Sequence, residues 1–157
     1  IRTYQRFDGM GGARWMQNAL GMQGPQQALY GMFQWGLFDR FPRIKIILLE
    51  SGAGWIGAAL DRMDAIFETS LGDGVPLKER PSTYFKRQCW ISGDPDERAL
   101  AHIVDYVGDD RFFWATDYPH FDHPGNYMEE LEELVAPLSE NARNNLLGDS
   151  VAAVYGI

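Results

Sequence analysis

The stretch Ile44-Lys45-Ile46-Ile47-Leu48-Leu49-Glu50-Ser51-Gly52 decides the fold class. Its first six residues are almost continuously apolar, β-branched at the start and too few for a comfortable helix, so they predict a buried parallel strand over 44–49. A helical pattern ends at Pro42 before this strand, and a second helical pattern begins near Gly54 after it. A strand that lies between two helices is typical of α/β folds.

The same alternation of helices and strands continues along the chain. Short strands are predicted over 88–92 and 111–116, and the helix between them is predicted to begin with Asp94 as N-cap and to end at Gly108. Glu97 has the spacing of a capping box relative to Asp94. Residues 70–83 are rich in glycine and proline and predict a long loop, and helices finish the chain. The order predicts parallel strands joined by crossover helices.

Three strands are too few for a stable parallel sheet that is covered on both faces. We therefore expect further strands to precede Ile1, which agrees with the absence of an initiating methionine at that position.

Composition and charge narrow the classes of function. The net charge is −8, and the 14 basic residues are scattered rather than grouped, so we expect no nucleic-acid partner. No apolar run approaches the roughly 20 residues that cross a bilayer, so we expect no membrane partner. Cys89 is the only cysteine in the sequence, which excludes an internal disulfide and favours a reducing, cytoplasmic location.

Candidate chemical groups follow the predicted strands, because ligands of parallel α/β folds bind beyond the carboxyl ends of the strands. Asp117 closes the aromatic strand over 111–116, where a carboxylate needs a partner such as a divalent metal ion, or acts as a base toward metal-bound water. A simple turn-forming role for Asp117 is equally open. Glu50 has the same place after the strand over 44–49, as a metal ligand, as a carboxylate that orients one, or as an ion-pair partner. His120 follows in a loop, where it could contact substrate or metal.

A second motif favours a different chemistry. Gly52-Ala53-Gly54-Trp55-Ile56-Gly57 fits the pattern G-x-G-x-x-G of dinucleotide-binding folds and lies between a strand and a helix. Such a fold also needs a strand that ends in an acidic residue for the ribose. Asp73 has the spacing, but no strand pattern precedes it. A dinucleotide-binding module that uses Gly52, Gly54 and Gly57 therefore stays an alternative to glycines that allow a tight turn and close packing.

Several segments together resemble the amidohydrolase-related family, the branch of the amidohydrolase superfamily that includes aminocarboxymuconate-semialdehyde decarboxylase. The matching segments are residues 36–45, 49–55, 61–64, 81–85, 116–120 and 146–157. The resemblance implies an α/β fold of the distorted (β/α)8 TIM-barrel type, with the predicted strands as the sixth to eighth. Residues 1–157 would then be a single partial barrel domain without its N-terminal strands.

The resemblance also implies a function. It predicts a metal-dependent hydrolase or carboxy-lyase (decarboxylase) that acts on a small organic acid, amide or ester. Asp117 would be the catalytic aspartate and a metal ligand, Glu50 a second metal ligand, and His120 and Trp55 substrate-binding residues. The implied cofactor is a divalent metal ion with zinc as the first candidate, although Glu50 stands where many members carry histidine.

The family's histidines of the first and fifth strands are not in this sequence. We therefore expect the isolated chain to be an inactive, truncated fragment. We further expect it to form a homo-oligomer or to associate with the missing half of the barrel.

Overall fold

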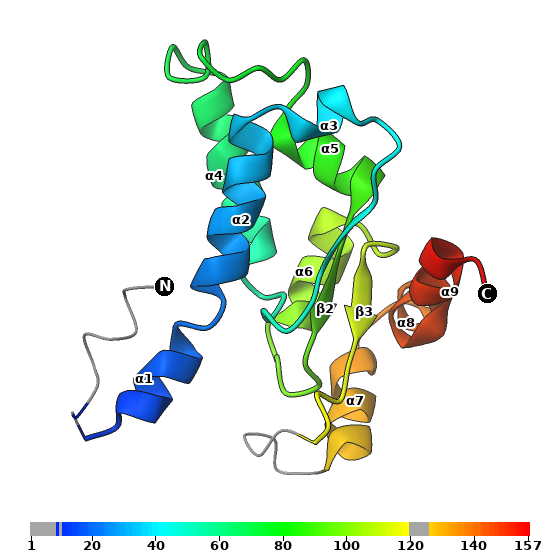
Figure 1. The fold of residues 1–157 in the computed structure, drawn as a ribbon. Coiled ribbons are helices and arrows are strands. Elements are labelled where there is room, and N and C mark those ends of the chain that lie inside the picture. The colour runs from blue at the N-terminus through cyan, green and yellow to red at the C-terminus, as the bar shows by residue number, and fades with distance from the viewer. Residues whose placement is uncertain (1–8, 10, 120–125) are drawn as a thin grey trace.

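The computed structural model describes residue 9 and residues 11–119 and 126–157 (Figure 1). A three-stranded parallel sheet in the order β1-β2-β3 lies at its centre. The strands are β1 (Ile46–Leu48), β2 (Cys89–Gly93) and β3 (Phe112–Trp114). The register aligns Leu48 with Ile91 and Ile91 with Phe112, so the three carboxyl ends lie at one edge of the sheet. The predicted parallel strands are confirmed, although β1 and β3 are shorter than the apolar runs over 44–49 and 111–116.

Helices connect and follow the strands. They are α1 (Ala13–Ala19), α2 (Gln23–Gln34), α3 (Leu37–Arg40), α4 (Ile56–Phe67), α5 (Pro81–Gln88), α6 (Leu100–Val107), α7 (Tyr127–Val135), α8 (Glu140–Asn144), a π-helical turn η2 (Asn145–Asp149) and α9 (Ser150–Tyr155). Each strand-to-strand connection contains a helix, as the sequence pattern predicts. Among the described residues, no helix combines the length and the apolar character needed to span a bilayer.

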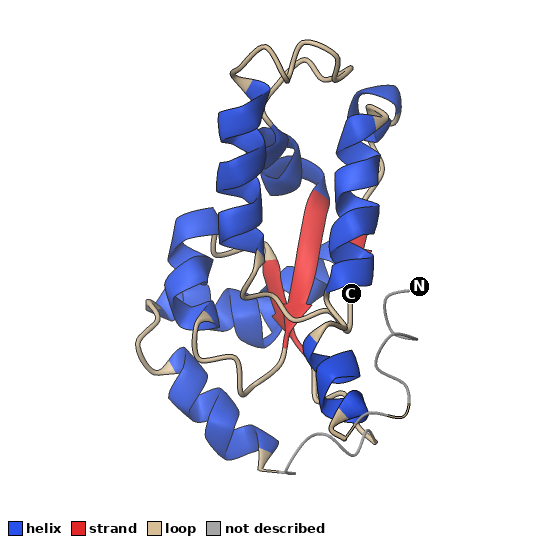
Figure 2. Ribbon diagram, turned by 90° about the vertical axis from the view of Figure 1, so that its left-hand side faces the viewer, coloured by secondary structure: helices blue, strands red, loops and turns tan. Residues whose placement is uncertain are grey.

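The two faces of the sheet contact different helices, because successive side chains of a strand point to opposite faces. Leu48, Ile91 and Phe112 belong to the large core that the sheet forms with helices α2 to α8 and the turn η2. Trp90 and Phe113 belong to a smaller cluster with α9 on the other face. Figure 1 shows α2, α4 and α6 on one side of the strands and α8 and α9 on the other, and Figure 2 shows the strands running through the helical shell.

The lone cysteine lies inside the large core. Cys89 is fully buried, and burial raises the pKa of its thiol to about 12. A thiol in this environment stays protonated at neutral pH and is not a nucleophile. The predicted cytoplasmic location stays a prediction.

The helical pattern over residues 29–37 is divided into two helices by a glycine. Gly36 has a φ of 62°, and a Cβ at this position would lie 2.6 Å from the carbonyl oxygen of Pro76. Only glycine combines this backbone conformation with so close an approach. The chain therefore turns at Gly36, so α2 ends at Gln34 and α3 begins at Leu37.

Two helix starts differ from the sequence prediction. α5 begins at Pro81, within the predicted loop over 70–83, because proline suits the first turn of a helix and the aromatic residues that follow it are buried. α6 begins at Leu100 rather than directly after Asp94, and the residues between them form turns. The termination of α6 at Gly108 is as predicted.

A buried hydroxyl group joins α5 to α3 and to the loop between α4 and α5. Tyr84 donates to Asp39 Oδ2 at 2.6 Å and accepts from the backbone N–H groups of Lys78 and Glu79 at 3.0 and 3.2 Å. The hydrogen bond from Tyr84 lowers the pKa of Asp39. Burial, followed by the bond to Asp39, raises the pKa of Tyr84.

We expect Tyr84→Phe to lower the free energy of unfolding by about 0.5–1.5 kcal/mol, because the carboxylate of Asp39 and the N–H of Glu79 lose their hydrogen bonds to the buried hydroxyl. A carboxyl group with a lowered pKa stabilises the fold only while it is ionised. The difference between wild type and variant should therefore shrink as the pH falls through the pKa of Asp39, below its ordinary value of 3.8. Urea unfolding at neutral and acidic pH measures both effects. Tyr155→Phe, at a 58% exposed position, is the matched control, and equal losses in the two variants would contradict the prediction.

Candidate functional site

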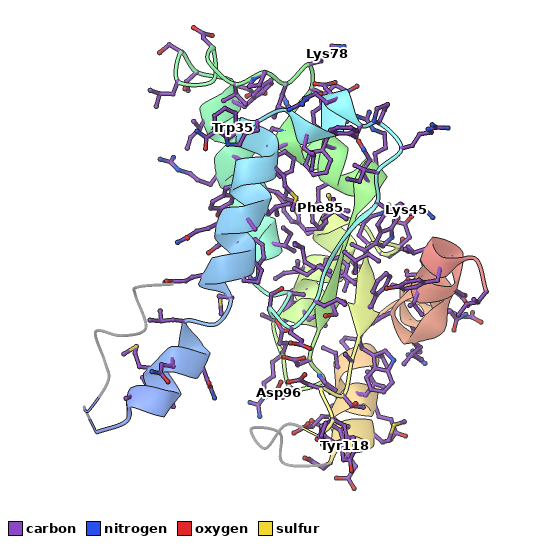
Figure 3. The ribbon with its side chains drawn as sticks, in the orientation of Figure 1. Trp35, Lys45, Lys78, Phe85, Asp96 and Tyr118 are labelled. Atoms are coloured by element: carbon purple, nitrogen blue, oxygen red, sulfur yellow. The ribbon has the colours of Figure 1, made fainter. Side chains whose placement is uncertain are left out.

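The carboxyl ends of the strands bring two of the predicted site residues to one edge of the sheet. Glu50 lies two residues after β1, and Asp117 lies three residues after β3. Figure 3 shows this end of the molecule through Asp96 and Tyr118, which lie opposite to Lys78 and Trp35. The strand ends therefore form a common platform for the side chains that follow them.

Glu50 and Asp117 also share an uncommon backbone conformation. Each has a φ of 52°, and among the described residues they are the non-glycine residues with positive φ. This left-handed conformation is rare outside glycine, costs about 1–3 kcal/mol and concentrates at ligand-binding and catalytic positions. The same strained geometry after two parallel strands distinguishes these two carboxylates from the other acidic residues that the structure describes.

The two carboxylates are candidate ligands of a metal ion. β2 separates their strands, so the strand ends are about 10 Å apart, which corresponds to two strand spacings. Glu50 is exposed and Asp117 is half-buried. Carboxylate oxygens are suitable ligands for hard divalent cations. However, no group of three or more His, Cys, Asp or Glu side chains in the described ranges is arranged to hold a metal ion. The described residues alone therefore do not form a complete metal site.

The two predicted substrate-binding residues have different outcomes. His120 lies outside the described residues, so its role stays a prediction. Trp55 is half-buried beside α4, and its indole N–H donates to the carbonyl oxygens of Ser51 and Gly52 at 3.1 and 3.0 Å. The polar atom of Trp55 thus holds the loop that follows Glu50.

The glycine-rich loop after β1 binds a carboxylate of the chain itself. Glu97 accepts from the N–H of Ala53 at 2.8 and 2.9 Å, from the N–H of Gly54 at 2.7 Å and from the N–H of Asp94 at 2.9 Å. A dinucleotide pyrophosphate would require the same N–H groups at the start of the helix. In this structure these donors already have an acceptor.

Gly57, the last glycine of the motif, has a packing role. A Cβ on Gly57 would lie 3.5 Å from Ile103 and from Tyr106, so the missing side chain allows α4 and α6 to approach closely. Asp73 lies in the loop between α4 and α5, with no strand before it. The dinucleotide-binding alternative is therefore wrong for the loop in this conformation, and the turn-and-packing interpretation of its glycines holds.

Comparison with known proteins shows which family the chain matches. The family model described as amidohydrolase matches residues 26–157. The gamma-resorcylate decarboxylase of Polaromonas sp. is 30% identical over 103 residues, which cover 60% of this chain and 30% of that protein.

Solved structures agree with this result. The 5-carboxyvanillate decarboxylase of Sphingomonas paucimobilis is 30% identical with a TM-score of 0.68, over 87% of this chain and 41% of that one. A dihydroxybenzoic acid decarboxylase of Polaromonas sp., solved with manganese and the inhibitor 2-nitroresorcinol, is 23% identical with a TM-score of 0.66, over 86% of this chain and 40% of that one.

The chain thus spans less than half the length of these relatives. Its parallel sheet with helices on both faces is consistent with part of their barrel fold. The extent of the family match, together with the site at the carboxyl edge, leads to one conclusion: the chain belongs to the amidohydrolase family.

Proposed function

We propose that the complete protein is a metal-dependent decarboxylase of hydroxylated aromatic carboxylic acids, and that this chain supplies the sixth to eighth strands of its barrel as a single partial domain. The observation that carries the proposal is the pair of left-handed carboxylates, Glu50 and Asp117, at the carboxyl edge of the sheet. The two relatives that are 30% identical act on gamma-resorcylate and 5-carboxyvanillate, and they favour decarboxylation over hydrolysis.

The proposed reaction assigns a separate role to each carboxylate. Decarboxylation of an aromatic acid breaks the carbon–carbon bond to the carboxyl group, releases carbon dioxide and places a proton on the ring carbon. Asp117 is the proposed group that holds and transfers this proton, since a positioned carboxyl group can act as a general acid or base. Glu50 is the proposed second carboxylate that would hold the cation. The cation, when bound, would attract the oxygen atoms of the substrate.

The proposed cofactor is a divalent cation whose remaining ligands come from the other strands of the barrel. Zinc stays a prediction from the family resemblance. Manganese is bound in the dihydroxybenzoic acid decarboxylase of Polaromonas sp., so both cations belong in an activity test.

We further propose that the chain associates through its sheet edges. Within the described residues, the outer edges of β1 and β3 have no strand partner. A strand that adds to either outer edge would pair the free backbone groups of that edge. The proposed partner is the remaining part of the barrel or a second copy of the chain.

We expect the purified 157-residue chain to show no turnover of gamma-resorcylate or 5-carboxyvanillate with either manganese or zinc. The complete protein, which adds the other strands, should consume at least one of these acids. Loss of substrate absorbance together with carbon dioxide release measures the reaction. Turnover by the isolated chain would contradict the expectation of an inactive fragment, and an inactive complete protein would contradict the proposed function.

A further inference from the structure

Glu97 joins the loops that follow two neighbouring strands. Its carboxylate accepts from Ala53 and Gly54, which lie 44 and 43 positions away in the loop after β1, and from Asp94 in the loop after β2. β1 and β2 are paired in the sheet, so these loops lie side by side at the carboxyl edge. A single side chain therefore connects the loop of Glu50 to its neighbour.

Glycines allow the backbone to close around this carboxylate. A Cβ on Gly52 or on Gly54 would lie 3.4 or 3.3 Å from Glu97 Oε2, and a Cβ on Gly93 would lie 3.1 Å from Oε1. The Cβ on Gly93 would also lie 2.5 Å from Leu100 Cδ2, which is closer than real Cβ contacts. The glycine pattern that resembles a phosphate-binding loop thus surrounds an internal anion.

The hydrogen bonds from the two loops to the Glu97 carboxylate are of a strong kind. Hydrogen bonds from N–H groups to a carboxylate are roughly twice as strong as those between neutral groups. Gly54 lies two residues before α4, and a negative charge at this end of a 12-residue helix is stabilised by the helix dipole. On its other side the same loop is held by the indole N–H of Trp55, and Ser51 within it is only 4% exposed.

We propose that Glu97 is a positioning residue for the site at the carboxyl edge. By holding the loops after β1 and β2 together, it fixes the backbone segment that carries Glu50 and Trp55. The consequence for catalysis rests on the proposed function, but the connection itself can be tested on the 157-residue chain.

The first test measures the melting temperature of the chain. Glu97→Ala leaves three N–H groups without their acceptor, and the melting temperature should fall by roughly 3–12 °C. Sodium acetate should restore part of the loss in a concentration-dependent way, because the carboxylate of acetate can occupy the vacated position. Sodium chloride at the same ionic strength should not. Glu97→Gln removes the negative charge, so the variant should also melt at a lower temperature. Its side chain still fills the space, so acetate should not restore the melting temperature. Glu132→Ala, at an exposed position on α7, should leave the melting temperature unchanged.

The second test measures activity in the complete protein. Glu97→Ala should lower kcat per folded molecule by roughly 10–100-fold with a smaller change in KM, because displaced reacting groups lose rate rather than affinity. Acetate should recover part of kcat.

The outcomes separate the two proposals. An unchanged melting temperature, or a loss that acetate does not restore, would overturn the connection. An unchanged kcat per folded molecule would overturn the positioning role. Acetate rescue of the chain together with an inactive wild-type complete protein would support the connection and overturn the proposed function alone.

Discussion

Replacing Asp117 with asparagine is expected to lower kcat/KM of the complete protein on its aromatic acid substrate by roughly 10²–10⁴-fold, the range observed when a positioned acid or base is removed. Asparagine has nearly the same size as aspartate and tolerates the left-handed conformation, here a φ of 52°. The substitution therefore removes the charge and the transferable proton while the backbone keeps its shape. Initial rates of substrate consumption, measured with manganese and with zinc, give the effect.

The matched control for this prediction is Asp73→Asn. Asp73 lies exposed in the loop between α4 and α5, so the same chemical change is made away from the carboxyl edge. Both variants should have the melting temperature of the wild type within about 2 °C, because substitutions that keep shape and backbone have small effects on stability. A wild-type rate in Asp117→Asn would show that Asp117 only forms the turn before Tyr118, which is the alternative that the sequence leaves open.

Glu50→Gln is expected to act in the same direction with a smaller effect. Glu50 is exposed, whereas Asp117 is half-buried. Water therefore screens the charge of Glu50 more strongly than the charge of Asp117. A larger loss in Glu50→Gln than in Asp117→Asn would reverse the roles proposed for the two carboxylates.

The sequence predicts the three strands correctly, because each strand is a short apolar run that is recognisable without knowledge of its neighbours. The apolar runs around Ile47, Ile91 and Phe113 form strands because both faces of the sheet are covered. α5 was not predicted, because Tyr84 and Phe85 are followed by Lys86 and Arg87, and this short pattern has little helical periodicity. A proline at the first position was the available signal for this helix.

The sequence predicts where the candidate site residues Glu50 and Asp117 lie, but not their backbone geometry. The rule that ligands bind beyond strand ends identified Glu50 and Asp117, but no residue type signals that both adopt a positive φ. For Glu97, the capping-box spacing predicted the contact with the N–H of Asp94, which is three residues away. The contacts with Ala53 and Gly54 depend on the pairing of β1 with β2, so they appear only in the folded chain.

The stability of the sheet depends on the helix-covered core, and Phe85→Ala tests this dependence. Phe85 on α5 is fully buried in the large core and is labelled in Figure 3. Removal of the ring leaves a cavity, so the free energy of unfolding should fall by about 3–5 kcal/mol. The corresponding fall in melting temperature is roughly 6–20 °C for a domain of this size. Phe41→Ala is the matched control, because Phe41 is 50% exposed and should lose less than about 1 kcal/mol.

The same variant distinguishes core packing from association through the sheet edges. Strand pairing with a second copy would make the melting temperature depend on protein concentration, because only the folded chain binds. Phe85 belongs to the large core and not to a sheet edge, so its substitution should lower the melting temperature by the same amount at low and high concentration. A loss in Phe85→Ala that disappears at high concentration would mean that association, rather than the large core, holds α5 against the sheet.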